Sequence, residues 1–187
     1  GIVNVTPDSF SGDGLGEGAD MVARALDQAA RFIEAGADIL DVGGESTRPG
    51  ASPVTAAEEI DRVVPTIEAI SERFPEAVLS IDTSKAAVAE AAINAGAHWL
   101  NDIWALKADP DIAALAAERK IPVVLMHNRS RPKAVVTDAR LGSQYLGATY
   151  DHLMEDVAAE LTAFVENALA AGIGRERIIL DPGIGFG

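Results

Sequence analysis

Polar side chains end several short apolar runs of this chain, and they are the first candidates for chemistry. Asp82, Asn101 and Asp181 each lie at such a position. A carboxylate accepts two parallel N–H donors, whereas an amide offers one donor and one acceptor. Three such groups around one pocket would suit a flat heterocycle whose edge carries amino, ring N–H and carbonyl groups. Each residue alone could instead cap its own turn, as Asp and Asn often do.

Polar residues near the ends of the other apolar runs suggest further roles. Asn4 offers a neutral oxygen that suits Mg²⁺ shared with a polyphosphate, although a backbone hydrogen bond explains it equally well. Asp41 and Glu45 could form a general acid–base pair, but structural hydrogen bonding is the simpler interpretation. His127 has no partner at metal-ligand spacing, so it predicts no zinc site. The nucleophile motif G-x-S-x-G is absent from the sequence.

One glycine-rich loop combines backbone freedom with donors. Residues 43–50 read Gly-Gly-Glu-Ser-Thr-Arg-Pro-Gly, in which Ser46, Thr47 and Arg48 could bind an anionic or carbonyl-bearing ligand. The alternative is a turn that Pro49 and Gly50 punctuate. Two apolar residues, Met126 and Phe186, could sandwich a flat ring, and core packing explains them equally well.

The composition describes a globular chain and excludes several classes of function. The 187 residues are 48% hydrophobic and 24% charged, which allows a sizeable core. A formal net charge of −14 disfavours nucleic acid and anionic membranes as partners. An anionic substrate would therefore need arginine, lysine or a metal ion in its site. The sequence has no cysteine for a disulfide and no apolar run long enough to span a membrane.

Apolar runs alternate with helical patterns along the chain. The runs predict strands at residues 1–6, 39–42, 77–81, 98–103, 121–126 and 178–180. Apolar residues at helical spacing predict helices between most of these strands, and Thr55 with Glu58 forms a capping box at the start of one. Residues 130–150 lack a clear period and predict an extended loop. Near-continuous apolar strands alternating with helices require a parallel sheet covered by helices.

Two architectures have this order of elements, an open doubly wound sheet and a (β/α)8 barrel. The G-x-G-x-x-G phosphate signature of the first is absent after the opening strand. In a barrel, the C-terminal ends of all strands meet at one mouth, where the active site lies. The polar residues at those ends are Asn4, Asp41, Asp82, Asn101 with Asp102, His127 and Asp181. We therefore predict an α/β fold, a (β/α)8 TIM barrel forming one domain over residues 1–187, with strands 1 to 6 of 8 present.

Six motifs, in this order, resemble those of the dihydropteroate synthase family. They are Asn-Val-Thr-Pro-Asp-Ser-Phe-Ser at 4–11, the 43–50 loop, Ser-Ile-Asp-Thr at 80–83, Asn-Asp-Ile at 101–103, Leu-Met-His at 125–127 and Leu-Asp-Pro-Gly-Ile-Gly-Phe-Gly at 180–187. The resemblance covers essentially the whole chain. It implies a transferase that condenses 6-hydroxymethyl-7,8-dihydropterin pyrophosphate with p-aminobenzoate in folate biosynthesis, giving 7,8-dihydropteroate and pyrophosphate.

The resemblance also implies roles for the residues that match the motifs. Pterin binding would fall to Asp82, Asn101, Met126, Asp181 and Phe186, and p-aminobenzoate binding to Phe10, Thr47, Arg48 and Pro49. Asn4 would help hold Mg²⁺ and pyrophosphate, and Asn4, Arg48, Asp82 and Asp181 would be the catalytic residues. The reaction would be a substitution at the pterin methylene, with pyrophosphate leaving first. The whole protein would be a cytoplasmic homodimer and a sulfonamide target, with Mg²⁺ as cofactor and small molecules as substrates.

The chain departs from the family pattern in two places. The first loop reads Ser-Phe-Ser-Gly-Asp-Gly at 9–14, where the family has S-F-S-D-G-G, so the acidic residue Asp13 is displaced by one position. The chain also stops before the family's S-R-K and R-x-H segments, which supply basic groups for pterin, p-aminobenzoate and pyrophosphate. It begins at Gly1, inside an apolar run, so we expect truncation at both ends. We expect residues 1–187 alone to aggregate or stay molten and to be inactive.

Two other interpretations remain open at this stage. A pterin-binding methyltransferase barrel would use similar pterin contacts but pass a methyl group to a corrinoid, and the 43–50 loop argues against it. A non-catalytic fragment would bind pterin weakly or not at all.

Overall fold

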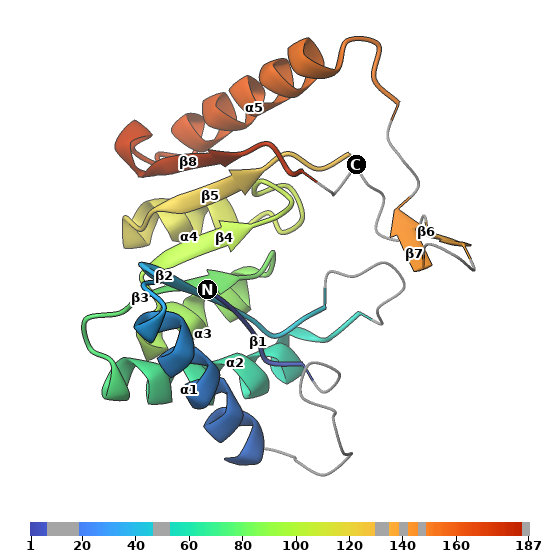
Figure 1. Ribbon diagram of the computed structural model, residues 1–187. Helices are drawn as coiled ribbons and strands as arrows, with labels where there is room; N and C mark the ends of the chain where they lie inside the picture. The colour runs from blue at the N-terminus through green and yellow to red at the C-terminus, as the bar shows by residue number, and fades with distance from the viewer. Residues whose placement is uncertain (7–18, 47–52, 130–134, 139–141, 146–148, 185–187) are drawn as a thin grey trace. The chain divides into compact units, whose positions relative to one another are not determined.

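The computed structural model describes residues 1–6, 19–46, 53–129, 135–138, 142–145 and 149–184 (Figure 1). These residues form two compact units. One unit holds the described residues up to Asn101, and the other holds those from Asp102 onwards. Strands and helices alternate through most of both units, as the sequence predicts.

The first unit is built from four parallel strands and three helices. In chain order they are β1 (Ile2–Asn4), α1 (Ala19–Glu34), β2 (Ile39–Gly43), α2 (Ala56–Arg73), β3 (Val78–Asp82), α3 (Ala86–Ala95) and β4 (Trp99–Asp102). The strands pair in sequence order, β1 with β2, β2 with β3 and β3 with β4, and every pair is parallel. Parallel pairing brings the C-terminal ends of all four strands to the same edge of the sheet.

The strands and helices of the first unit share one apolar core. Leu40, Val42, Leu79 and Ile81 on β2 and β3 are fully or almost fully buried. On α2 the buried stripe follows helical spacing and includes Glu59, Val63, Thr66, Ile67 and Ile70. Helix α2 packs beside α1 and α3, so its apolar face is covered by protein. The residues that alternate with Leu40 and Val42 on β2, Ile39 and Asp41, are only partly buried, so one face of this strand carries most of the core.

The second unit contains the remaining described elements. They are α4 (Ile112–Arg119), β5 (Val123–Met126), β6 (Val135–Asp138), β7 (Gly142–Tyr145), α5 (Leu153–Ala170), a 3₁₀ turn (Arg175–Arg177) and β8 (Ile178–Asp181). Strands β5 and β8 are parallel, and Met126 lies opposite Asp181 in their register. Helix α5 lies against both strands (Figure 1). Parallel strands alternating with helices in both units confirm the predicted α/β fold class.

Residues 130–150 do not form the plain extended loop that we predicted. Strands β6 and β7 pair antiparallel, with Val135 opposite Tyr145 and Asp138 opposite Gly142. Val135, Val136 and Thr137 are β-branched residues, which favour extended strands. The sequence did not predict these strands because they carry no regular apolar period. They hydrogen-bond to each other, so they need no buried face.

Helix α2 begins with the capping box that the sequence predicts. The hydroxyl of Thr55 accepts a hydrogen bond from the Glu58 amide at 3.3 Å, and the Thr55 amide donates to Glu58 Oε2 at 3.0 Å. The Thr55 hydroxyl also donates to Glu58 Oε2 at 2.8 Å, and the bonds donated by the Thr55 amide and hydroxyl lower the pKa of the Glu58 carboxyl. The reciprocal bonds satisfy amide groups that the first turn of a helix cannot satisfy itself.

We predict that Thr55→Ala destabilises the protein by about 1 kcal/mol, because one amide of α2 loses its acceptor. Thr55→Ser keeps the hydroxyl and should restore most of the loss. The measurement is the free energy of unfolding in urea for the wild type and both variants. Equal stability of the alanine and serine variants would contradict this role for the hydroxyl.

Candidate functional site

The C-terminal ends of the first three strands bring two predicted site residues to a shared glycine. The ladder register sets Asn4 opposite Gly43 and Gly43 opposite Asp82. A Cβ atom built on Gly43 would lie 3.5 Å from Asp82 Oδ2 and 3.6 Å from Asn4 Oδ1. Because Gly43 has no side chain, the polar ends of Asn4 and Asp82 face the same small space above it. Within the first unit, the predicted convergence of polar strand ends is therefore present.

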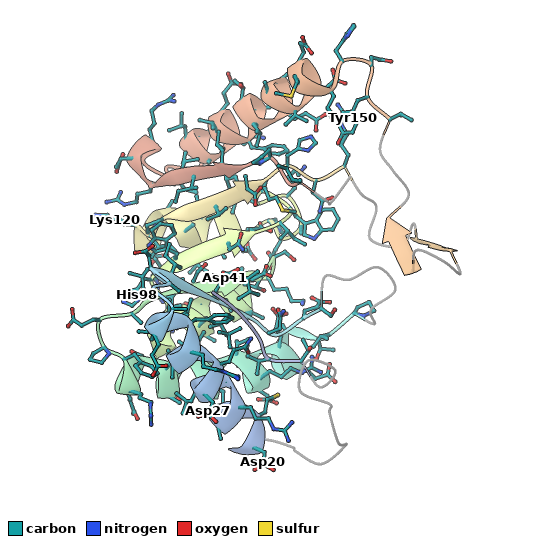
Figure 2. The ribbon with its side chains drawn as sticks, viewed as in Figure 1. Asp20, Asp27, Asp41, His98, Lys120 and Tyr150 are labelled. Carbon is teal, nitrogen blue, oxygen red and sulfur yellow. The ribbon has the colours of Figure 1, made fainter. Side chains whose placement is uncertain are left out.

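A second contact at this edge joins Asp41 (Figure 2) to Asn101 on β4. The Asn101 amide Nδ2 donates to Asp41 Oδ2 at 2.9 Å, which fixes the orientation of both side chains. The other oxygen, Asp41 Oδ1, is buried and accepts no hydrogen bond from the described residues. An unsatisfied buried acceptor is costly, so this oxygen is suited to receive an N–H group from a ligand.

Glu45 does not pair with Asp41 as an acid and a base would. Its Oε2 instead forms an ion pair with Lys85, which also pairs with the buried carboxylate of Glu59. Its Oε1 accepts a hydrogen bond from the Val54 amide at 3.1 Å. Burial lowers the pKa of Lys85, but hydrogen bonds and charge from Glu45 and Glu59 outweigh burial and raise it above its ordinary value. The structural interpretation of Glu45 is therefore the better one.

The sequence analysis missed Lys85 and Glu59. A signal for Glu59 was available, because it lies in register with Val63, Thr66 and Ile70 on the buried stripe of α2. A carboxylate on such a stripe must be paired with a cation or a donor. The partner could not be identified from sequence, because Lys85 lies on a different element, at the start of α3.

In the second unit, hydrogen bonds to Asp181 join the C-terminal ends of β5 and β8. The His127 amide donates to the Asp181 carbonyl oxygen at 2.8 Å, and the Gly183 amide donates to Asp181 Oδ1 at 2.7 Å. Gly183 has a φ of +68°, and a Cβ atom there would overlap the His127 carbonyl oxygen. Asp181 thus caps its own turn with one oxygen. Its Oδ2 is not used by that turn.

Asp102 uses both of its carboxylate oxygens within its own turn, whereas Asp181 uses one. Its two oxygens accept from the amides of Trp104 at 2.9 Å and Leu106 at 2.7 Å. Burial raises the pKa of the Asp102 carboxyl, and the two amides offset part of that effect. Ala105 and Leu106 both adopt positive φ angles, of 51° and 63°, which brings the Leu106 amide back toward the carboxylate. Asp102 therefore acts as a turn cap and not as a ligand group.

His127, which follows β5, forms a cluster with Arg129 and with Glu160 of α5. Its buried ring places Nε2 2.9 Å from Glu160 Oε2, and Arg129 Nε donates to Glu160 Oε1 at 2.7 Å. The Arg129 guanidinium also lies 4.2 Å from the ring centroid of Tyr150 (Figure 2). Sequence analysis missed Glu160 and Arg129, because neither belongs to a motif with fixed spacing.

Asn4, the residue predicted to help hold magnesium, lies at the C-terminal end of β1. Among the described residues, no three His, Cys, Asp or Glu side chains gather as metal ligands. Asn4 would therefore contribute a single neutral oxygen. Mg²⁺ commonly binds in this way, with few protein ligands and the remaining positions filled by phosphate oxygens and water.

Several predicted site residues lie outside the described part of the chain. They are Phe10, Thr47, Arg48, Pro49 and Phe186, together with Asp13 of the first loop. Their predicted roles stay predictions.

Comparison with known proteins gives one consistent family. The model of the family described as "Pterin binding enzyme" matches residues 1–187. The chain is 48% identical over 187 residues to the dihydropteroate synthase of Clostridium beijerinckii, covering all of this chain and 62% of that protein. It is 45% identical over 186 residues to the Bacillus subtilis dihydropteroate synthase, again covering the whole chain and 58% of the relative. The chain thus spans about three fifths of the length of these relatives.

Solved structures agree with the sequence comparison. The Xanthomonas albilineans dihydropteroate synthase with 4-aminobenzoic acid is 42% identical, with a TM-score of 0.84 over all of this chain and 61% of that one. The Clostridium difficile dihydropteroate synthase solved in the presence of pteroic acid is 39% identical, with a TM-score of 0.85 over the whole chain and 64% of its own. These likenesses confirm the resemblance drawn from the motifs and the predicted fold, an incomplete (β/α)8 barrel.

The cluster around Glu160 predicts a pH-dependent contribution to stability. A hydrogen bond from Arg129, its charge, and the contacts of His127 lower the pKa of Glu160 below its ordinary 4.5. The ionised carboxylate therefore stabilises the fold above pH 4.5, and this stabilisation is lost as the pH falls through the lowered pKa. We expect Glu160→Gln to lower Tm near neutral pH and to have a shrinking effect below pH 4.5.

The control is Glu166→Gln, which removes the same charge from an exposed position on the same helix, away from its first turn. It should change Tm little at any pH. Thermal melts of the three proteins across the acid range make the measurement. A Glu160→Gln effect that stays constant with pH would mean that the ion pair adds nothing to stability.

Proposed function

This chain belongs to the family of pterin-binding enzymes, and on that premise we propose that the natural protein containing it is a dihydropteroate synthase. The observation that carries the proposal is identity of 45–48% along the whole chain to synthases of that name, with every motif of the resemblance present. Solved relatives hold 4-aminobenzoic acid in one case and 7,8-dihydropteroate in another. Neither the methyltransferase nor the non-catalytic alternative gains a specific observation in its favour.

The proposed reaction is a substitution at the methylene carbon of the pterin. The C–O bond to pyrophosphate breaks with its electron pair leaving on oxygen, and the amino nitrogen of p-aminobenzoate forms the new C–N bond and then loses a proton. Positive charge develops on the pterin when pyrophosphate leaves first. Carboxylates that accept N–H groups from the pterin would stabilise that charge, so positioning and electrostatics would supply the catalysis.

We assign pterin binding to Asp82, Asn101, Met126, Asp181 and Phe186. The geometry supports the acceptors within each unit. Asp82 Oδ2 faces the space above Gly43, and Asp181 keeps Oδ2 available because the Gly183 amide occupies only Oδ1. Asp41 Oδ1 is a further buried acceptor beside Asn101. Each unit thus offers acceptor oxygens that suit a heterocycle rich in N–H donors.

We assign p-aminobenzoate binding to the two glycine-rich loops, through Phe10, Thr47, Arg48 and Pro49. Arg48 would supply a cation in a chain whose formal net charge is −14. Asn4 would bind Mg²⁺ together with the pyrophosphate group, and the ion would neutralise the charge of the leaving group. Asn4, Arg48, Asp82 and Asp181 are the proposed catalytic residues.

We propose a cytoplasmic location, a homodimeric whole protein and sensitivity to sulfonamides, with small molecules rather than nucleic acid or membrane as partners. A Yersinia pestis synthase that is 45% identical has been solved with a sulfonamide drug, which supports the third of these. In the described part of the chain, no helix has the length and apolar character needed to cross a membrane.

The first test concerns the charge on Asp181. Asp181→Asn keeps an oxygen that can accept from the Gly183 amide, so the local turn should survive, but it removes the charged acceptor for the pterin. We expect it to weaken binding of the pterin pyrophosphate by about 2–5 kcal/mol in the natural protein. Asp181→Ala also frees the Gly183 amide and should bind no better. Calorimetry that finds unchanged affinity in the asparagine variant would refute the assignment.

The second test concerns Asn4 and magnesium. We expect Mg²⁺ to strengthen binding of the pterin pyrophosphate, because a strongly acidic protein meets a polyanionic substrate. Asn4→Ala should reduce the gain in affinity from Mg²⁺ about tenfold or more, because one metal ligand is lost. Binding of a pterin without the pyrophosphate should stay the same. Titrations with and without Mg²⁺ give both numbers. If affinity does not depend on Mg²⁺, Asn4 is only a strand-end group.

A further inference from the structure

A partly buried group of charges lies at the base of the 43–54 loop, and the proposed reaction does not use it. We call it the anchor cluster and define it as Glu45, Glu59, Arg62 and Lys85. Lys85 Nζ pairs with the carboxylates of both Glu45 and Glu59. Glu59 is only 1% exposed, and Lys85 and Glu45 are largely covered. Arg62 Nη1 donates to the Gly44 carbonyl oxygen at 2.8 Å.

The anchor cluster holds both described ends of the loop. At the first end, Gly44 sits so tightly that a Cβ atom would lie 2.7 Å from Val63 Cγ1 and 2.9 Å from Glu59 Cγ. At the other end, the Val54 amide donates to Glu45 Oε1 at 3.1 Å. Glu45 therefore joins the two ends to each other with one oxygen and to Lys85 with the other. Without Lys85, Glu45 would lose the ion pair that ties it to α3.

Stability alone gives a weak reason for such a cluster. Removing two carboxylates and an ammonium group from water is costly, and an apolar group of the same volume often serves the fold as well or better. A charged pair does specify one geometry, because its hydrogen bonds fix distance and direction together. The cluster is therefore better suited to setting the position of the loop than to stabilising the core.

The strand ends assigned to the pterin are held by different interactions. Asp82 and Asn101 face each other in the ladder between β3 and β4, and Gly43 faces Asp82 in the ladder between β2 and β3. The Asn101 side chain is held by Asp41. The strand ladders and the contact between Asp41 and Asn101 are made by residues other than those of the anchor cluster. The residues assigned to p-aminobenzoate, in contrast, follow directly after Glu45 and Ser46 in the chain.

We propose that Lys85 is a positioning residue for the p-aminobenzoate side of the reaction. It acts through Glu45, whose two oxygens fix the points where the loop leaves β2 and returns to α2. The inference rests on the proposed function and deepens it, because it names a residue that sets the position of the 43–54 loop without touching either substrate.

The test compares the Michaelis constants of the two substrates in the natural protein. Lys85→Met keeps the aliphatic stem and removes the ammonium group. We expect it to raise KM for p-aminobenzoate about tenfold, as a displaced binding loop should. The KM for the pterin pyrophosphate should change less than about twofold, because its assigned strand ends stay in the sheet. Lys85→Arg restores a cation and should recover most of the p-aminobenzoate effect.

Two further variants separate positioning from stability. Glu58→Ala, one residue from Glu59 on α2, removes the capping box but has no contact with Lys85 in the cluster. It should lower Tm and leave the ratio of the two KM values unchanged. The double variant Glu59→Gln with Lys85→Met leaves no unpaired buried carboxylate at position 59, so it should fold. It should still show the raised KM for p-aminobenzoate.

Hydrogen exchange gives a reading that does not depend on catalysis. In Lys85→Met, the amides of Gly44 to Ser46 and of Val54 should exchange faster than in the wild type, and in Glu58→Ala those of Gly44 to Ser46 should not. Equal changes in both KM values, or unchanged exchange in Lys85→Met, would overturn the positioning role. A wild type that forms no dihydropteroate while the exchange result holds would overturn the proposed function, and with it the substrate named here.

Discussion

Register between parallel strands is the constraint on which the rest of the first unit depends. Because β1, β2 and β3 run in the same direction, Asn4, Gly43 and Asp82 occupy one row at the C-terminal edge. A one-residue shift of β2 would replace Gly43 in that row by Val42 or Gly44, and Val42 would place a side chain between the two polar groups. The apolar residues of β2 and β3 fix this register, since any slip would move Leu40, Val42 and Ile81 out of the core.

Three strands carry an aspartate at or near the C-terminal end, and the hydrogen bonds of the three carboxylates differ. Both carboxylate oxygens of Asp102 accept hydrogen bonds from backbone amides of its own turn. In Asp181, one oxygen accepts a hydrogen bond from a backbone amide of its turn. In Asp41, one oxygen accepts from the Asn101 amide, and the other is buried without a donor from the described residues. Acceptors left unsatisfied by the fold are the ones available to a ligand. A polar residue at a strand end is therefore only a candidate until the donors around it are known.

Residues whose partners are close in sequence could be predicted, and residues whose partners are distant could not. The capping box of Thr55 and Glu58 and the six polar strand ends follow from local pattern, and the strand ends favoured the barrel that the family resemblance also implies. Lys85 was missed because Glu45 and Glu59 are 40 and 26 residues away in the chain. Arg129 and Glu160 were missed for the same reason. The hairpin of β6 and β7 was missed because its strands pair with each other and need no buried face.

The hairpin has a consequence for the order in which the chain can fold. Each strand of the first unit pairs with the next strand along the chain, so those pairings close comparatively short loops. The pairing of β5 with β8 joins Val123 to Ile178, the widest sequence separation among the described strand pairs. Closing a long loop costs more entropy, and locally formed structure within it reduces the length that stays free. A hairpin forms in microseconds and needs no partner outside its own segment. By forming early, β6 and β7 would shorten the flexible connection and lower the entropic barrier to adding β8.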